Sequence, residues 1–226
     1  MNFFTSKIAE FLLKPIFLKF FLKEIKGLEN LPRGNFILAC NHQSHLDELC
    51  AGAVAVFSKH YNFHFIGQTD RYRGIVKFLM YLLYFLTGTL PVNRKNEISK
   101  KRVLEKAIKV LKKGHVLIMY PEGTRSRNGR LLPVKCGIAK IFLATGVPIL
   151  PVAIKGTFEL MPAGKVIPKF KKIIKILVGK PLDLQEEFER GKKLSPESKE
   201  YGELIERITK KVEENIRELF FNFKNV

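Results

Sequence analysis

A histidine and an aspartate lie five positions apart in the stretch NHQSHLD, directly after an apolar run. His42 follows the run Phe36–Cys40, which is typical of a buried strand, and Asp47 lies in the helix predicted at Leu46–Phe57. If His42 lies just outside that helix and folds back over its first turn, the carboxylate of Asp47 can bind one nitrogen of the imidazole. The other nitrogen is then left to accept a proton, which is the arrangement of a general base.

Three other interpretations of this stretch stay open on the residues alone. A histidine at a strand end often only hydrogen-bonds to backbone. His42, His45 and Asp47 also form a conceivable metal-ligand set, although the sequence shows no further cluster of ligands, and we expect no metal site. A Ser or Cys nucleophile served by His42 is the third, but there is no G-x-S-x-G motif, and Cys40 and Cys50 lie in apolar runs.

A second group of reactive side chains lies in YPEGTRSRNGR, Tyr120–Arg130, which follows the predicted strand Val116–Met119. Gly123 allows a close approach of backbone to a ligand. Thr124 supplies a hydroxyl, and Arg125 supplies a guanidinium suited to bidentate phosphate binding. The alternative is a polar turn with a solvated basic tip.

Arg94 ends a third stretch, GTLPVNR, after a short extended run, and is a candidate for a second phosphate ligand. A Walker loop is absent from the sequence, so nucleotide binding of that type is not expected.

Strand-like and helix-like segments alternate from residue 24 onward, which predicts an α/β fold with a mostly parallel central sheet flanked by helices. In such sheets, functional residues lie in the loops after the strand ends. The predicted strands are Phe36–Cys40, Phe63–Ile66, Val116–Met119, Ile149–Ile154 and Ile173–Val178. The predicted helices are Leu46–Phe57, Gly74–Leu86, Ile98–Lys112, Gly137–Ala144 and Pro196–Phe220.

The first 23 residues differ from the rest and divide the chain into an N-terminal segment, 1–23, and a main domain, 24–226. Lysines recur at helical spacing before and after Pro15, with Phe and Leu on the remaining positions. This pattern predicts two short amphipathic helices with a bend, suited to lying in a membrane interface. Packing of the same helices on the protein core is the alternative. The longest nearly uncharged run, Phe78–Val92, is shorter than the roughly 20 residues that a spanning helix needs.

The net charge of +19 favours an anionic partner, such as a lipid surface or an acidic protein. No nucleic-acid-binding motif is visible and Trp is absent, so we expect no nucleic-acid partner. The three cysteines match no metal or disulfide framework, and the N-terminus has no secretory signal. We therefore expect a protein of the cytoplasmic face of the cell membrane, bound peripherally or monotopically.

Taken in this order, NHQSHLD, GTLPVNR, YPEGTRS and VPILPVAI resemble the four motifs of the glycerolipid acyltransferase family. The similarity is greatest to its 1-acyl-sn-glycerol-3-phosphate (lysophosphatidate) acyltransferases and runs from about residue 24 to about residue 180. The departures are small: Tyr120 stands where the family often has Phe, and Pro91 makes the second motif less hydrophobic.

The resemblance implies transfer of a fatty acyl group from a thioester, on acyl carrier protein or coenzyme A, to the free hydroxyl of lysophosphatidate, which yields phosphatidate. It implies that His42 deprotonates that hydroxyl, that Asp47 orients His42, and that no cofactor is needed beyond the acyl thioester. It further implies a phosphate-binding group in which Glu122 positions the acceptor or the loop and Lys135 is an additional basic contact. Its members are Arg94, Glu122, Gly123, Thr124, Arg125 and Lys135.

Two other functions remain alternatives: acylation of glycerol 3-phosphate or another lysophospholipid, and non-catalytic binding of anionic lipid. The expected partners are a membrane surface, lysophosphatidate and the acyl donor. The apolar segment Phe78–Leu86 is expected to line a tunnel for the acyl chain or to face lipid.

Overall fold

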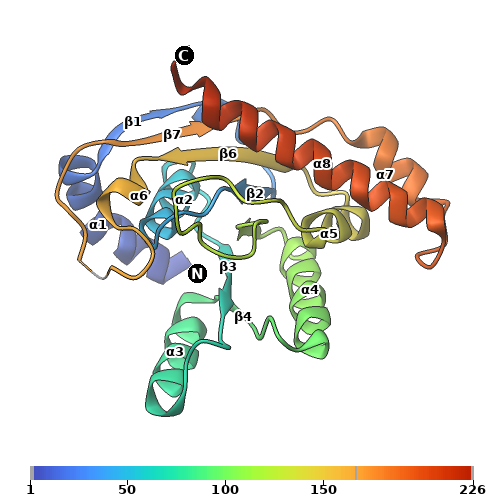
Figure 1. Ribbon diagram of the computed structural model, residues 1–226, viewed down its shortest axis with the longest axis horizontal. Helices are drawn as coiled ribbons and strands as arrows, with labels where there is room; N and C mark the ends of the chain where they lie inside the picture. The colour runs from blue at the N-terminus through green and yellow to red at the C-terminus, as the bar shows by residue number, and fades with distance from the viewer. Residues whose placement is uncertain (1–2, 166, 225–226) are drawn as a thin grey trace.

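Short apolar runs form the strands of one central sheet (Figure 1). The computed structural model describes residues 3–165 and 167–224. In chain order the strands are β1 Leu22–Lys26, β2 Ile37–Cys40, β3 Phe63–Gln68, β4 Leu90–Val92, β5 Val116–Met119, β6 Ile149–Lys155 and β7 Ile174–Val178.

The order of strands across the sheet is β1-β7-β6-β2-β5-β3-β4. The five strands from β6 to β4 run parallel, β7 is antiparallel to β6, and β1 is parallel to β7. The predicted α/β fold with a mostly parallel sheet is therefore confirmed.

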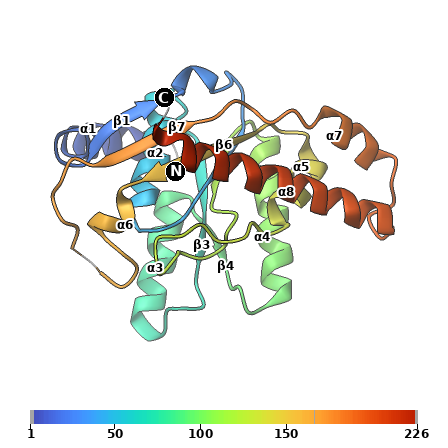
Figure 2. The same ribbon diagram turned by 45° about the horizontal axis from the view of Figure 1, so that its top comes forward.

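Helices cover both faces of the sheet (Figures 1 and 2). They are α1 Phe3–Phe20, α2 Leu46–Phe57, α3 Gly74–Thr87, α4 Glu97–Lys112, α5 Gly137–Thr145, α6 Thr157–Leu160, α7 Gln185–Lys192 and α8 Lys199–Phe221, with short 3₁₀ helices η1 Leu28–Asn30 and η2 Asn222–Lys224. The predicted helix Leu46–Phe57 and strand Val116–Met119 have the predicted ends, and the other elements predicted after residue 24 differ by a few residues at most.

Strand β2 lies at the centre of the core, and all four of its side chains are buried. Leu38 and Cys40 pack against one layer, with α1 and α2, while Ile37 and Ala39 pack against the other, with α4, α5 and α8. A strand buried on both faces reads as a continuous apolar run, which is why the sequence indicates it clearly. The loop that carries His42 begins directly after this strand and so starts from a fixed position.

The described residues of the N-terminal segment have another arrangement than the predicted pair of helices. One helix, α1, continues through Pro15, and Leu22–Lys26, of which the first two residues belong to the predicted helical segment 1–23, forms strand β1 beside β7. Leu22 is buried in the core, so pairing with a distant strand outweighs the local lysine spacing. Residues 1 and 2 and many α1 side chains lie outside the described part, and membrane binding by segment 1–23 remains a prediction.

None of the helices among the described residues combines the length and the apolar composition that crossing a bilayer requires.

Candidate functional site

The imidazole of His42 is hydrogen-bonded to the carboxylate of Asp47, with 3.0 Å between Nδ1 and Oδ2. Asp47 lies in the first turn of α2, and His42 lies in the loop before it, as predicted. A carboxylate oxygen accepts here, so Nδ1 carries the ring proton and Nε2 keeps its lone pair. The geometry is therefore that of an oriented general base.

Backbone groups fix the position of Asp47. Its Oδ2 atom also accepts the N–H groups of Gln43 at 2.6 Å and Ser44 at 2.7 Å. The side chain is fully buried, and Oδ1 has no hydrogen-bond partner among the described residues. The negative charge also lies at a helix N-terminus, where the helix dipole stabilises it. The carboxylate is thus held by the fold rather than by His42 alone.

Asn41 attaches the start of the loop that carries His42 to strand β6. Its side-chain amide donates to the carbonyl of Ile154 at 3.0 Å, and the N–H of Ile154 donates to the Asn41 Oδ1 atom at 2.7 Å. These two bonds continue the pairing of β2 with β6 beyond the end of β2. His42 consequently begins from a point that two strands define.

The ring of His42 stacks on the ring of Tyr120, with centroids 4.0 Å apart and planes inclined by 14°. The Tyr120 hydroxyl is buried and has no hydrogen-bond partner among the described residues. Burial raises the pKa of the Tyr120 phenol, so this side chain stays neutral. Tyr120 therefore serves as a flat apolar support that fixes the orientation of the imidazole.

Glu122 joins two loops from a buried position. Its Oε1 atom accepts the N–H of His42 at 3.1 Å, and its Oε2 atom accepts the N–H of Leu132 at 3.2 Å. Burial raises the pKa of this carboxyl to about 7. The N–H of Ser126 in turn donates to the carbonyl of His42 at 2.8 Å. These contacts place Glu122 behind the loop as a positioning residue and not among the residues that would touch a phosphate.

Arg94 is connected to the same loop, since its guanidinium donates to the carbonyl of Gly123. Its backbone N–H donates to Asp70 Oδ1 at 3.1 Å, and its Nε lies 3.8 Å from that oxygen. Arg94 follows β4, whereas Asp70 follows β3, so two neighbouring strand ends fix the arginine.

Lys135 covers Gly123 from another side. A side-chain carbon added at Gly123 would lie 3.0 Å from the Lys135 Nζ atom, and the Gly123 φ angle of 69° also favours glycine. The backbone N–H of Lys135 donates to the carbonyl of Pro121 at 2.9 Å. Thr124 is exposed beside them. The structure therefore brings the predicted residues of this group together around the loop 120–126.

Arg125 is half-buried, and Arg71 lies close enough to affect its charge. Burial and the Arg71 charge both lower the pKa of the Arg125 guanidinium. We name Arg71, Arg94, Arg125 and Lys135 the basic cluster. Such a concentration of positive charge at strand ends favours a bound anion.

Arg71 was not predicted from the sequence. The signal available was its place in TDRYRG, just beyond the end of a strand-like run, where parallel sheets carry functional residues. The run was read as ending at Ile66, whereas β3 continues to Gln68. Because the actual strand is two residues longer, the segment that carries Arg71 begins directly after the end of β3.

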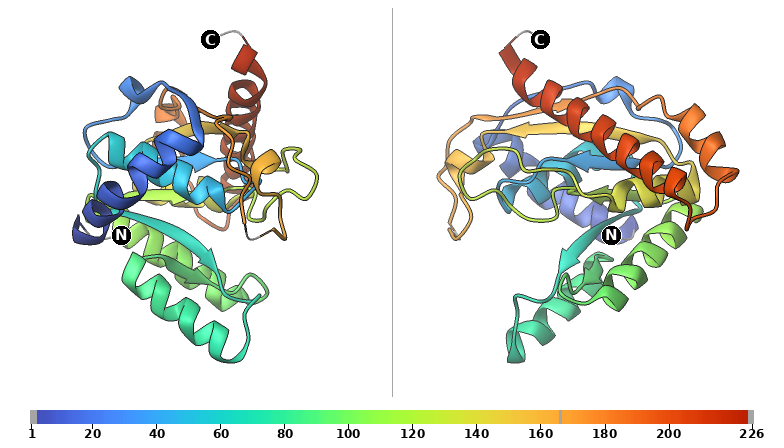
Figure 3. Two further views of the ribbon diagram at one scale, coloured as in Figure 1. Left: turned by 90° about the vertical axis from the view of Figure 1, so that its left-hand side faces the viewer. Right: turned by 45° about the vertical axis from the view of Figure 1, so that its right-hand side comes forward.

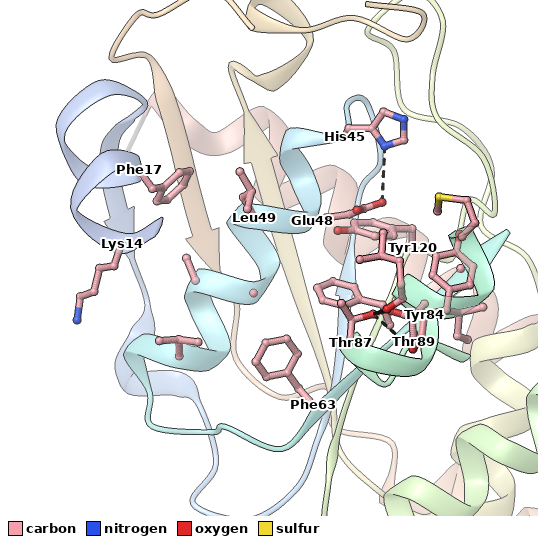
Figure 4. Close-up of a pocket in the computed structure, with 18 of the residues that line it drawn as sticks. Lys14, Phe17, His45, Glu48, Leu49, Phe63, Tyr84, Thr87, Thr89 and Tyr120 are labelled. Atoms are coloured by element: carbon pink, nitrogen blue, oxygen red, sulfur yellow. Dashed lines mark hydrogen bonds and ion pairs between the residues drawn. The ribbon is translucent and has the colours of Figure 1, made fainter. Parts of the chain in front are cut away.

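An apolar groove of about 560 Å³ begins beside Tyr120 and extends between α1, α2, β3 and α3 (Figure 4). Its lining is mainly aliphatic and aromatic, and includes Phe17, Leu49, Gly52, Phe63, Met80 and Tyr84. Lys14 directs its ammonium away from the groove in Figure 4. Because Tyr120 contacts both His42 and the groove, a chain bound in the groove would end near the base.

The alternative chemistries find less support in these contacts. Among residues 3–165 and 167–224, no three or more His, Cys, Asp or Glu side chains are placed to hold a metal ion. His45 is exposed and lies 3.7 Å from Glu48. Cys40 and Cys50 are buried free thiols, and burial raises the pKa of both. A buried neutral thiol is a poor nucleophile.

Comparison with known proteins agrees with this arrangement. The sequence model of the Acyltransferase family matches residues 23–155, a span that includes His42, Asp47 and the basic cluster. A chloroplastic 1-acyl-sn-glycerol-3-phosphate acyltransferase of Brassica napus is 31% identical over 165 residues, which make up 72% of this chain and 46% of the relative. A 1-acyl-sn-glycerol-3-phosphate acyltransferase of Escherichia coli is 35% identical over 130 residues, 55% of this chain and 48% of the relative.

The crystal structure of the 1-acyl-sn-glycerophosphate acyltransferase of Thermotoga maritima has a TM-score of 0.66 to this chain at 28% identity, covering 98% of this chain and 81% of that one. The matched part spans under half the length of the curated relatives from B. napus and E. coli. The match of the family model extends over more than half of this sequence and contains the whole loop that carries His42. The chain belongs to the Acyltransferase family.

Proposed function

We propose that this protein transfers a fatty acyl group from a thioester to the sn-2 hydroxyl of 1-acylglycerol 3-phosphate, and so forms phosphatidate for phospholipid synthesis. The observation that carries the proposal is the oriented His42–Asp47 pair, placed between the basic cluster and the apolar groove. A phosphate, a nucleophilic hydroxyl and an acyl chain each find a suitable environment there. The names of the B. napus and E. coli relatives support the same reaction.

The first step is proton transfer to His42. Nε2 takes the proton of the acceptor hydroxyl while Asp47 holds Nδ1–H and stabilises the imidazolium that forms. The acceptor oxygen then attacks the thioester carbonyl and forms the new C–O bond. When the tetrahedral intermediate collapses, the C–S bond breaks, and the leaving sulfur takes the proton back from Nε2. No acyl-enzyme is required, and His42 returns to its neutral state.

The basic cluster would bind the phosphate of the acceptor. Arg94 and Lys135 both lie at Gly123, and Arg125 is two residues from Gly123 along the same loop. Charge-assisted hydrogen bonds from these donors would hold the acceptor by its phosphate and leave its free hydroxyl to face His42. The exposed hydroxyl of Thr124 is a further donor at the same edge.

The groove would bind an acyl chain. The middle of the segment 78–86 contributes Met80, Leu83 and Tyr84 to its lining, while Phe78 and Phe85 are exposed. Different side chains of this one helix can therefore fill the two roles expected for the segment. Some would line the chain-binding site, and others would face lipid. We further propose that segment 1–23 seats the protein on the cytoplasmic leaflet, and that the donor is acyl carrier protein or coenzyme A thioester.

The test is acyl transfer in mixed micelles of lysophosphatidate with acyl coenzyme A or acyl carrier protein, followed by free thiol and by phosphatidate. His42→Ala should lower kcat by about 10²–10⁴-fold, because the general base is lost. His60→Ala is the matched control, since His60 lies before β3, at the opposite end of the strands, and should keep wild-type kcat.

Four results would contradict the proposal in different ways. Wild-type transfer by His42→Ala would remove His42 from the mechanism. Loss of transfer on addition of EDTA would favour the metal set of His42, His45 and Asp47. Tight binding to anionic lipid without transfer from either donor would support the non-catalytic alternative, and faster transfer to glycerol 3-phosphate would identify a different acceptor.

A further inference from the structure

None of the side chains of helix α3 is buried, although nearly all of its residues are apolar. Its 14 residues, Gly74–Thr87, contain one charge, Lys77. Phe85 is 83% exposed, Ile75 is 70% exposed and Phe78 is 64% exposed. The helix stands away from the rest of the molecule, below the sheet in Figure 1 and at the bottom of both views of Figure 3.

The exposed apolar surface of α3 extends around most of the helix. Counted at about 100° per residue, its exposed apolar positions cover an arc of about 220°. They are Ile75, Val76, Phe78, Leu79, Tyr81, Leu82, Leu83, Phe85 and Leu86. A helix that docks against one protein surface needs a stripe little more than 100° wide. An arc twice as wide is suited to immersion in an apolar medium.

The opposite face of α3 forms the roof of the groove, and Leu83 lies at the boundary between the two faces. Met80, Leu83 and Tyr84 line the groove, and the Tyr84 hydroxyl donates to the carbonyl of Gln68 at 2.9 Å. Gly67 makes room for this contact, because a side-chain carbon there would lie 2.6 Å from the Tyr84 ring. The same helix thus contacts the proposed acyl-chain site on one side and solvent on the other.

Positive charges lie at the start of α3. Arg71 and Arg73 precede it, Lys77 is in its first turn, and all three are exposed. They would meet anionic lipid headgroups if the helix lay in a leaflet, and would attract those headgroups electrostatically. A second copy of this chain is a poorer partner, since it would bring another net charge of +19 to the same place.

The described part of α1 exposes apolar side chains as well, among them Phe11, Ile16 and Phe20. In the left view of Figure 3, α1 and α3 both lie on the side of the molecule that faces the viewer. Helix α6, which follows β6, lies on the same side. Two apolar helices on one side can enter one leaflet together. Since α3 is about 21 Å long and the hydrocarbon core about 30 Å thick, α3 would lie within a leaflet and not span it.

We propose that α3 is a second membrane-inserted element, which embeds its outer face in an anionic phospholipid leaflet while its inner face roofs the groove. The groove is then continuous with the hydrocarbon of the leaflet along the edge of α3, at Leu83. A lipid tail can slide sideways beneath the helix without crossing water. This inference rests on the proposed function in one respect, namely that the groove binds a fatty acyl chain.

The absence of tryptophan from the sequence allows a clean test. Phe85→Trp places one fluorophore on the outer face of α3. Phe221→Trp is the matched control, because Phe221 is 63% exposed and is the last residue of α8. The C-terminal end of α8 and helix α3 lie at opposite ends of the molecule in Figure 1. With phosphatidylglycerol vesicles, emission from Phe85→Trp should move to shorter wavelength and be quenched by bromine-labelled acyl chains. Phe221→Trp should remain accessible to iodide in water.

A charge at the same position should weaken binding. Phe85→Glu should lower partitioning into these vesicles at least about tenfold, equivalent to about 1.4 kcal/mol, and Phe221→Glu should not. Phe85 does not line the groove, so transfer to a short-chain lysophosphatidate dispersed as monomers should stay at the wild-type rate.

Two results would overturn the inference. If Phe85→Trp stays accessible to iodide while sedimentation shows the protein on vesicles, α3 does not insert. If the emission shift appears without vesicles and grows with protein concentration, a second copy covers α3. Failure of the proposed function gives a different result, namely insertion of α3 without acyl transfer to any acceptor.

Discussion

His42 is positioned by backbone groups as much as by side chains. Its N–H and carbonyl are bound to Glu122 and Ser126, its ring rests on Tyr120, and its partner Asp47 is held by two backbone N–H groups. The sequence motif predicted the His42–Asp47 pair correctly. It could not predict the contacts of His42 with Tyr120, Glu122 and Ser126, because they join segments about 80 residues apart that only the sheet brings together.

Glu122→Gln should remove a pH-dependent part of the stability. Burial raises the pKa of Glu122 to about 7 from an ordinary value of 4.5, so between these values the folded protein holds a proton that the unfolded chain has released. The free energy of unfolding of the wild type should therefore fall, on the order of 1–3 kcal/mol, as the pH rises from about 4.5 to about 7. The glutamine variant, which has no such proton, should show a flatter dependence.

Urea unfolding on each side of this window, at about pH 4.5 and about pH 8, would measure the difference. Glu203→Gln is the matched control, since Glu203 is more than half exposed on α8 and its substitution should leave the pH dependence unchanged. If the wild type and Glu122→Gln lose stability equally over this range, the buried carboxyl of Glu122 is not its source.

At the scale of elements, the sequence indicated the strands and helices whose hydrophobic pattern lies within the element itself. The apolar runs of β2 and β5 and the periodicity of α2 are visible without knowledge of their neighbours. Strand β1 was missed because the spacing of its lysines suits a helix equally well. Its pairing with β7, in which Leu22 lies opposite Ile174, is what makes this segment a strand. Helix α7 was missed because, apart from Phe188, its residues are polar, charged or glycine.

Gly52→Leu should shorten the acyl chain that the groove accepts. Gly52 lies on α2 and lines the groove, and a side-chain carbon there would meet only the Phe63 and Phe65 rings, at 3.8–4.0 Å. The leucine would therefore fit and fill groove volume. Each methylene excluded from the groove is worth about 0.8 kcal/mol, so exclusion of two should change the preference for dodecanoyl over hexadecanoyl thioester by more than about tenfold.

Gly202→Leu is the control for the same substitution in a helix. Gly202 lies on α8 with open space around it, so this variant should keep the wild-type chain-length preference. Competition between the two thioesters in one reaction would measure the preference directly. An unchanged preference in Gly52→Leu would mean that the donor chain lies outside the groove.

At the scale of the whole molecule, the net charge of +19 should govern attachment to membranes. Partitioning into anionic vesicles should fall at least about tenfold as salt rises from about 0.05 M to about 0.5 M, since the Debye length drops well below about 10 Å. Binding to zwitterionic vesicles should be weaker and should change little. Sedimentation with vesicles of both kinds checks this, and salt-insensitive binding to the anionic ones would show that apolar insertion alone holds the protein there.

The contact of Asn41 with Ile154 has a consequence for biosynthesis. The two residues are 113 positions apart, and their paired hydrogen bonds hold the loop that carries His42. While the chain emerges from the ribosome, its histidine and aspartate are thus made early, but their support arrives only with β6. A nascent chain that stops short of Ile154 carries the whole motif and still lacks the anchored loop. The proposed activity would then switch on late in synthesis, once most of the sheet is in place.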